Sequence, residues 1–234
     1  ISKTYGAQKA VDQVSFSIDK AEIVGFLGPN GAGKTTTMKI ISTFLQANEG
    51  KALVCGYDVN DSPNEIRKRL GYLPEHNPLY LDMYVKEYLK FISGLHQIKD
   101  RKSRIDSLIQ QVGLKKEAHK KIGSLSKGYR QRVGLAQAMI HDPEVLILDE
   151  PTTGLDPNQL LEIRKLILEF GERKTILFSS HIMQKVQAIC DRVIIINEGK
   201  IVADDPIDIL THFQEEELVI EVKFAHPIDP ANIE

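Results

Sequence analysis

The feature that most constrains this chain is a glycine-rich loop between a short apolar run and a helical pattern. Residues 28–36 read Gly-Pro-Asn-Gly-Ala-Gly-Lys-Thr-Thr and fit the phosphate-binding pattern G-x-x-x-x-G-K-[ST] without a mismatch. The run before them, Ile23-Val24-Gly25-Phe26-Leu27, is rich in strand-forming residues, and residues 37–41 begin a helical pattern. The order strand, glycine loop, helix is therefore predicted.

This loop has the chemistry of a nucleoside triphosphate site. Its glycines let successive N–H groups and the helix N-terminus face a polyphosphate, Lys34 can reach the β- and γ-phosphates, and the Thr35 hydroxyl can ligate Mg²⁺. An ordinary glycine turn is the alternative, and the full motif between strand and helix disfavours it. We expect the nucleotide to contact Gly28, Pro29, Asn30, Gly31, Ala32, Gly33, Lys34, Thr35 and Thr36.

Composition indicates an ordinary globular protein of 234 residues, 42% hydrophobic and 26% charged. The formal net charge of −2 shows no basic excess, so we expect no nucleic-acid partner. Cys55 and Cys190 lie near apolar runs and are predicted to be reduced residues packed in the core, which favours a cytosolic compartment. No apolar run approaches the ~18 residues of a membrane span, so a membrane function would need another chain.

The apolar pattern predicts an α/β fold with a helical interruption. Four-residue aliphatic runs suit a parallel sheet covered on both faces, whereas the 3.6-residue spacing of residues 85–111 predicts a helical subdomain inserted at about residues 84–143. The strands expected are Val14–Ile18, 51–57, Val145–Leu148, Thr175–Phe178, Val193–Ile196 and, after a turn, Ile201–Val202.

Both ends of the sequence look trimmed. Ile1 starts without a methionine, so we expect the natural chain to begin earlier. Residues 218–222, Leu-Val-Ile-Glu-Val, predict one more strand, and residues 215–234 are expected to start an accessory region that is cut short. Residues 1–214 would then form the main domain.

Two adjacent carboxylates follow the aliphatic strand 145–148. Because side chains alternate along a strand, Asp149 and Glu150 can serve different tasks, one towards the metal held by Thr35 and the other towards an attacking water. Many Asp-Glu pairs simply belong to surface loops, but four aliphatic residues directly before this pair disfavour that alternative.

A small polar loop, Leu125-Ser126-Lys127-Gly128-Tyr129, precedes another helical pattern. Ser126 and the N–H groups after it can form a second helix N-terminus that grips an anion. Taken alone, the loop is more simply interpreted as a helix N-cap.

The order of these pieces resembles the ATP-binding subunit of ABC transporters over about 200 residues. The resemblance implies an α/β fold of the P-loop NTPase (RecA-like) class, with a parallel-sheet core, an antiparallel β subdomain and the inserted helical subdomain. It implies that Lys34, Glu150 and His181 are catalytic, that Ser126 and Gly128 form the signature loop, and that Asp156 lies in the D-loop after Gly154-Leu155. It also implies metal ligands at Thr35, Glu75 and Asp149, and an adenine-stacking ring at Tyr5.

Two of these residues have simpler alternatives. His181 follows Phe178-Ser179-Ser180 at a strand end, and the alternative is a loop histidine with satisfied hydrogen bonds. Tyr5 precedes a glycine, and a packed turn aromatic accounts for it almost as well.

Residues 72–80 resemble the single-domain, export-type branch, and most of all the ATP-binding subunit associated with gliding motility. Two departures from the family pattern stand out. Glu75 takes the place of the usual glutamine, which adds negative charge beside Mg²⁺. In the signature, Lys127 and Tyr129 differ from the consensus Leu-Ser-Gly-Gly-Gln, while Ser126 and Gly128 are kept.

The resemblance implies a homodimer that closes around two ATP molecules with Mg²⁺ and drives a separate integral membrane subunit. The chain would then be cytoplasmic and peripheral on the inner face of the cell membrane, and export is the expected direction. The alternative is a soluble ATPase of the same superfamily that acts on ribosomes or DNA. A nucleotide-binding regulator without turnover is disfavoured by Glu150.

Overall fold

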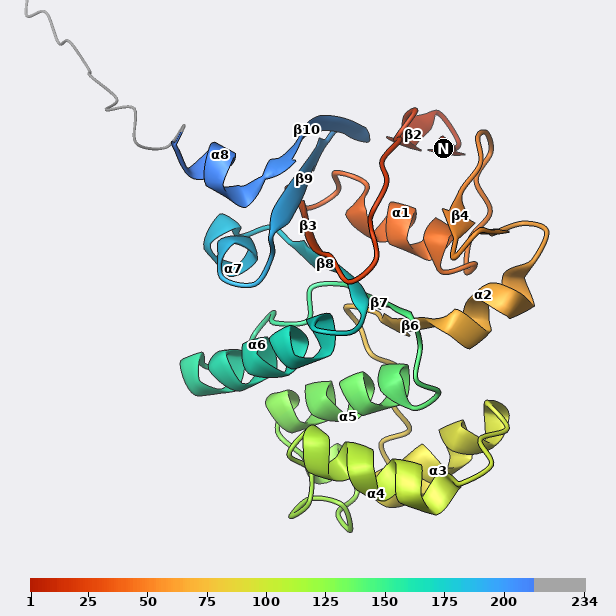
Figure 1. Ribbon diagram of the computed structural model, residues 1–234, viewed down its shortest axis with the longest axis vertical. Helices are drawn as coiled ribbons and strands as arrows, with labels where there is room; N and C mark the ends of the chain where they lie inside the picture. The colour runs from red at the N-terminus through yellow and green to blue at the C-terminus, as the bar shows by residue number, and fades with distance from the viewer. Residues whose placement is uncertain (213–234) are drawn as a thin grey trace, which may run out of the picture.

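The computed structural model describes residues 1–212, and its centre is a six-stranded sheet in the order β10-β9-β3-β8-β7-β6 (Figure 1). Parallel pairing joins β6 (Leu70–Leu73), β7 (Val145–Leu148), β8 (Thr175–Ser180), β3 (Ile23–Leu27) and β9 (Arg192–Asn197). The edge strand β10 (Lys200–Pro206) runs antiparallel to β9. The carboxyl ends of the parallel strands therefore meet at one edge of the sheet, where ligands of α/β proteins bind.

Two small antiparallel ladders complete the β structure. Strands β1 (Lys3–Tyr5) and β2 (Gln8–Val11) form one, and β4 (Leu53–Val54) and β5 (Tyr57–Asp58) form the other. In Figure 1 both lie at the end of the molecule that carries the N-terminus.

Helices cover both faces of the sheet. They are α1 (Lys34–Ile41), α2 (Pro63–Arg69), α3 (Val85–Leu95), α4 (Arg101–Gln111), α5 (Lys127–Met139), α6 (Pro157–Gly171), α7 (Met183–Gln187) and α8 (Ile207–His212), with a 3₁₀ turn at Ile122–Ser124. Helices α3, α4 and α5 pack together at the far end of the molecule from β1 and β2 (Figure 1). They lie within the range that the sequence indicates for a helical subdomain.

The alternation of side chains divides the core into two clusters. On one face, Ile147 and Leu177 pack with residues of α1 and α2; on the other, Leu146 and Phe178 pack with residues of α5 and α6. Because the central strands are buried on both sides, their sequences are continuous apolar runs, as in the Val-Leu-Ile-Leu of β7, with no alternation of polar residues. Within residues 1–212, no helix has the length and apolar character that a bilayer crossing requires.

Two strands expected from the sequence in the N-terminal part of the chain differ in the structure. Residues 14–18 form no strand in the described chain, although Val14 is buried while Ser15 and Ser17 are exposed, as their alternation indicates. The reason is that, among the described residues, only Val14 has a backbone partner, Ile1, and no strand is paired with the rest of this segment. Of residues 51–57, only β4 and the first residue of β5 are extended strand.

The expectation for Cys55 is wrong, because this residue is exposed in the turn between β4 and β5, with a φ of 50°. Cys190 is buried as expected, and burial raises the pKa of its thiol. The strand expected at 218–222 and the accessory region expected at 215–234 lie outside the described residues.

Candidate functional site

The glycine loop joins β3 to α1 at the carboxyl edge of the sheet. Two glycines are required by close contacts with neighbouring backbone. A Cβ on Gly28 would lie 2.3 Å from the carbonyl oxygen of Ile196, and one on Gly33, whose φ is 109°, would lie 2.5 Å from that of Ala10. The loop is thus fitted tightly between β9 and β2, which fixes where its N–H groups point.

Lys34 begins α1 with its amine folded back into the loop. Its Nζ donates to the carbonyl oxygens of Gly28 at 2.6 Å and Pro29 at 3.1 Å. The Glu150 carboxylate lies 3.9 Å from the same nitrogen. Burial lowers the pKa of Lys34, against the opposing effect of the Glu150, Asp149 and Glu75 carboxylates. A buried cation held by two carbonyl oxygens is placed to meet an anion in the loop.

A pocket of about 240 Å³ opens in front of this loop. It brings two of the carboxylates that the sequence singles out, Glu75 and Glu150, to the same space as Lys34 and Thr35, whereas Asp149 is not part of the lining. The residues that line it are Ala10, Asn30, Gly31, Gly33, Lys34, Thr35, Thr36, Glu75 and Glu150.

Asp149 follows β7 and is completely buried. Its N–H donates to the carbonyl oxygen of Leu73 at 2.9 Å, which continues the pairing with β6. Its Oδ1 accepts a hydrogen bond from Ser179 Oγ at 2.7 Å, whereas its Oδ2 is buried without a hydrogen-bond partner in the described part of the chain. An unpartnered carboxylate oxygen at full burial is costly unless something binds it.

Glu150 has a φ of 48°, which turns the chain sharply after the strand. Its N–H donates to Ser179 Oγ at 2.8 Å, and its carboxylate accepts from Thr153 Oγ1 at 2.9 Å. The Nδ1 of His181 lies 2.9 Å from the same carboxylate. Thr153 and His181 therefore fix this side chain at the pocket wall while Ser179 fixes its backbone, and two of the residues expected to be catalytic, Glu150 and His181, touch each other.

Ser179 is a site residue that the sequence patterns do not single out. It is fully buried near the end of β8, and its hydroxyl donates to Asp149 while accepting from the Glu150 N–H. The signal that could have found it is the pair of hydroxyls, Ser179 and Ser180, that ends an apolar run beside a strand that is followed by two carboxylates.

The residues present fit a bound Mg²⁺. Hard oxygen ligands suit this ion, and the unpartnered Oδ2 of Asp149 lies at the strand end beside a pocket that Thr35 and Glu75 line. No cluster of three His, Cys, Asp or Glu side chains placed to hold a metal occurs in residues 1–212.

The loop at Ser126 lies elsewhere, outside the lining of this pocket. Ser126 caps α5 by accepting from the Tyr129 N–H at 3.4 Å. A Cβ on Gly128 would lie 2.5 Å from the Gln159 side chain, and one on Gly154 would lie 2.3 Å from Lys127 Nζ. The signature loop therefore rests on the Gly154 loop and on α6 of its own chain.

The two remaining predicted residues lie outside the pocket lining as well. Asp156 is the N-cap of α6 and accepts from the Gln159 N–H at 2.9 Å. Tyr5 ends β1 with 49% of its surface exposed, and Lys3 Nζ lies 5.7 Å from its ring centroid. An exposed ring is free to stack on a flat ligand, but no contact in the described chain assigns that role.

Comparison with known proteins shows which family this chain belongs to. A family model described as ABC transporter matches residues 11–153. The chain belongs to the ABC transporter family. It is 43% identical over 198 residues to the ABC transporter ATP-binding protein NatA of Bacillus subtilis (strain 168), covering 83% of this chain and 80% of NatA. It is 39% identical over 213 residues to the bacitracin transport ATP-binding protein BcrA of Bacillus licheniformis, covering 89% and 68%.

Solved structures agree on the fold. An ATP-binding subunit of an ABC transporter superposes with a TM-score of 0.81 at 29% identity, covering 91% of this chain and 90% of that one. The dimeric ATP-binding cassette MJ0796, solved with ADP and Pi, also superposes with a TM-score of 0.81, at 24% identity, covering 88% of this chain and 96% of that one. The expected P-loop NTPase fold is thereby confirmed.

Proposed function

We propose that this chain is the ATP-binding and ATP-hydrolysing subunit of an ABC transporter. One observation carries the proposal: the pocket beside the phosphate loop is walled by Glu150, whose carboxylate is held by His181 and Thr153 within 3.9 Å of Lys34. A buried carboxylate next to a phosphate site is suited to orient or deprotonate water, which a simple binding module does not need.

The chain's own groups account for the catalytic tasks. Lys34 and the loop N–H groups bind the β- and γ-phosphates, and the start of α1 adds its positive dipole. Glu150 orients the attacking water, and His181 holds Glu150 and meets the γ-phosphate. Thr35, Asp149 and Glu75 would hold Mg²⁺, which neutralises phosphate charge when bound.

The signature loop supports a site shared by two chains. Ser126 and Gly128 do not line the pocket of their own chain, yet Ser126 is exposed and sits at a helix N-terminus that suits an anion. In a homodimer that encloses two ATP molecules, each loop covers the nucleotide of the partner subunit.

The docking surface for a membrane subunit is the apolar side of the helical subdomain. Tyr80 packs against Tyr88 and Phe91, with ring centroids 5.8 Å apart in each pair, and yet 54% of Tyr80 is exposed. Exposed apolar clusters of this kind mark interaction sites. The exposed large residues here are Tyr80, Leu81, Tyr84, Phe91 and Leu95, all carboxyl-terminal to Glu75. The chain would thus be peripheral on the cytoplasmic face of the membrane, with export as its direction.

A soluble ATPase acting on ribosomes or DNA is the second candidate, and the net charge of −2 gives it no support. The narrower resemblance to a gliding-motility subunit stays a prediction, since the names of NatA and BcrA say nothing of gliding.

The decisive test is Glu150→Gln, which keeps the side-chain shape and removes the carboxylate. ATP hydrolysis should fall by about a hundredfold or more, while calorimetry shows ATP still bound. The matched control is Glu172→Gln, an exposed carboxylate just after α6, which should hydrolyse ATP like the wild type. Wild-type turnover by Glu150→Gln would refute the assigned chemistry.

A further inference from the structure

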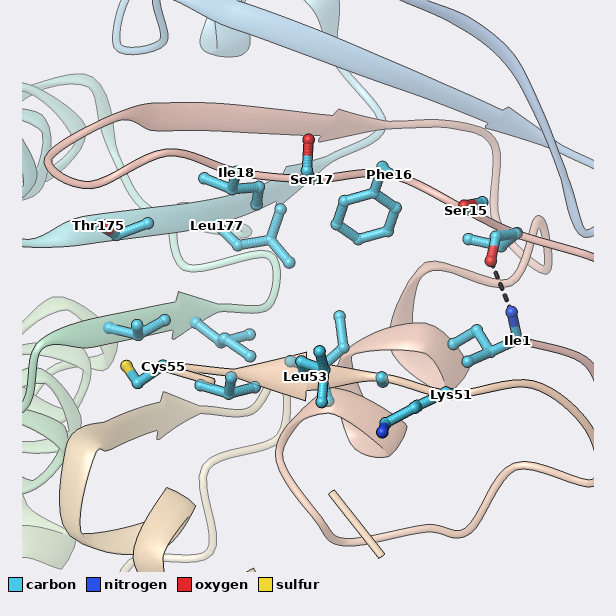
Figure 2. A pocket seen from close by; sticks show the side chains of 16 residues that line it. Ile1, Ser15, Phe16, Ser17, Ile18, Lys51, Leu53, Cys55, Thr175 and Leu177 are labelled. Carbon is cyan, nitrogen blue, oxygen red and sulfur yellow. Dashed lines mark hydrogen bonds between the residues drawn. The ribbon is translucent and has the colours of Figure 1, made fainter. Parts of the chain in front are cut away.

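Two cavities in the described chain differ in what their positive groups contact. The first, of about 440 Å³, lies between residues 14–18 and β4 (Figure 2). At one end of it, the Ile1 amine donates to the Val14 carbonyl oxygen at 2.7 Å. Its lysine, Lys51, lies with Nζ 3.6 Å from the Asp58 carboxylate. The protein itself therefore supplies partners for the positive groups of this cavity.

The second cavity, of about 310 Å³, is lined by residues of α6 and α7 and of the segments next to them. Its walls are mainly apolar, with Leu160 on α6, Ile182 at the start of α7, and Ala188 and Ile189 just after α7. Sites for small molecules begin at about 300 Å³ and are lined mostly by apolar side chains with a few polar groups. The cavity is therefore large enough for a small apolar group.

Two positive side chains line this second cavity without a partner. Arg164 on α6 and Lys185 on α7 are both partly buried, and within residues 1–212 neither side chain makes a hydrogen bond or an ion pair. The nearest carboxylate along α6, Glu162, is bound by Arg132 instead. Free cations beside apolar walls favour a ligand that is apolar at one end and anionic at the other.

A third polar group of the same cavity also has no partner. Thr152 lines the cavity, is only 2% exposed, and has a hydroxyl that is buried without a hydrogen-bond partner among the described residues. A buried hydroxyl without a partner is costly, and an oxygen acceptor in the cavity would offset that cost. The polar groups of the cavity thus point to a ligand that carries oxygen acceptors and a negative charge.

The cavity adjoins two segments that follow residues expected to be catalytic. Thr152 comes two residues after Glu150, and Ile182 directly follows His181. The Nδ1 of His181 lies 2.9 Å from the Glu150 carboxylate. A ligand in the cavity would contact both segments at once and could move these two side chains relative to each other.

We propose that the cavity between α6 and α7 is a regulatory site for a small amphipathic carboxylate. The apolar tail lies against Leu160, Ala188 and Ile189, and the carboxylate is bound by Arg164 and Lys185. Occupancy lowers ATP hydrolysis by displacing the segments after Glu150 and His181. This effect on turnover rests on the proposed function, whereas binding of the carboxylate does not.

Calorimetric titration of the nucleotide-free protein with octanoate tests the site. We expect one octanoate per chain, bound at least about tenfold more tightly than octylammonium, which has the same tail and the opposite charge, or than acetate, which lacks the tail. Arg164→Gln and Lys185→Gln should each weaken octanoate binding by about tenfold, because each removes a hydrogen bond between charged groups. The matched control is Lys165→Gln, an exposed lysine of α6 outside the lining, which should bind octanoate like the wild type.

A further variant tests the apolar part of the cavity. Ala188→Leu fills the space of the tail and should abolish octanoate binding, while circular dichroism shows the fold unchanged. Equal affinities for octanoate and octylammonium, or wild-type affinity for octanoate in both glutamine variants, would overturn the proposal. Loss of octanoate from the ATP-bound dimer of Glu150→Gln would assign this face to a second copy of the chain, and would overturn the proposal as well.

The effect on turnover is a separate measurement. Saturating octanoate should lower the wild-type kcat for ATP hydrolysis by about fivefold or more, and it should not change the rate of the Arg164→Gln/Lys185→Gln double variant relative to that variant alone. Octanoate that binds but leaves the wild-type kcat unchanged would refute the regulatory role. A chain that hydrolyses no ATP would refute the proposed function instead, and the calorimetric titration would still decide whether the site exists.

Discussion

The hydroxyl of Ser179 should contribute more to the free energy of unfolding than any other uncharged group at the site. It donates to Asp149 at 2.7 Å and accepts from the Glu150 N–H at 2.8 Å, and both Ser179 and Asp149 have no exposed surface. A hydrogen bond to a charged group contributes about 2 kcal/mol and a neutral one about 1 kcal/mol. Ser179→Ala should therefore lower the free energy of unfolding by about 3 kcal/mol.

Thermal unfolding followed by circular dichroism measures this loss. For a chain of this size each kcal/mol lowers Tm by about 2–4 °C, so Ser179→Ala should unfold about 9 °C earlier than the wild type. The matched control is Ser180→Ala. Ser180 is equally buried, but within the described residues its hydroxyl accepts only from the Ile182 N–H at 3.1 Å. Ser180→Ala should therefore lower the free energy of unfolding by about 1 kcal/mol and Tm by about 3 °C.

Catalysis gives an independent readout of the same substitution. Ser179 holds the backbone of Glu150 at a φ of 48°, and its loss should let the carboxylate shift and lower kcat by about tenfold or more. Ser180→Ala should stay within about twofold of the wild type. If Ser179→Ala lowers Tm and kcat no further than Ser180→Ala does, the assignment of Ser179 as the residue that positions both carboxylates is refuted.

Three further outcomes are expected. Lys34→Ala should abolish ATP binding measured by calorimetry while circular dichroism stays unchanged, and near-normal binding would contradict the phosphate-loop assignment. Gly128→Asp should leave ATP binding to the monomer intact but block the ATP-dependent dimer on gel filtration, whereas a dimer still trapped in a Glu150→Gln background would refute the shared site. Burial lowers the pKa of His141 to about 4, below its usual value of about 6.5, so the unfolded chain takes up the proton first and the free energy of unfolding should fall as pH drops through this window. Burial also lowers the pKa of His96, whose ring is stacked on that of His141 with the centroids 4.0 Å apart. His141→Gln should therefore flatten the pH dependence of urea unfolding only in part. An unchanged slope would contradict burial of His141 as its cause.

The phosphate loop and the strand before Asp149 were predictable because their chemistry is local. A glycine loop needs its residue types at fixed spacing, and an aliphatic run that ends in two carboxylates is unusual away from a binding site. Lys34, Glu75 and Glu150 meet at one pocket as the resemblance implies, although their roles remain predictions.

What the sequence could not provide depends on pairing between distant segments. Residues 14–18 alternate like a strand, but a strand exists only where a second one bonds to it. Cys55 follows an apolar run, yet the two-residue turn after β4 exposes it. Ser179 acts through hydrogen bonds to a neighbouring strand, and no local pattern indicates which hydroxyl will lie beside Asp149.

The contact between the signature loop and the Gly154 loop ties together two places that serve different nucleotides in the proposed dimer. Lys127 covers Gly154, which lies four residues after Glu150, and Gly128 rests on Gln159. In the proposed dimer, the loop that contacts the partner's nucleotide therefore packs against the segment that follows the catalytic carboxylate of its own chain. A displacement of the signature loop at one nucleotide of the proposed dimer would therefore press on the segment that follows Glu150 at the other nucleotide.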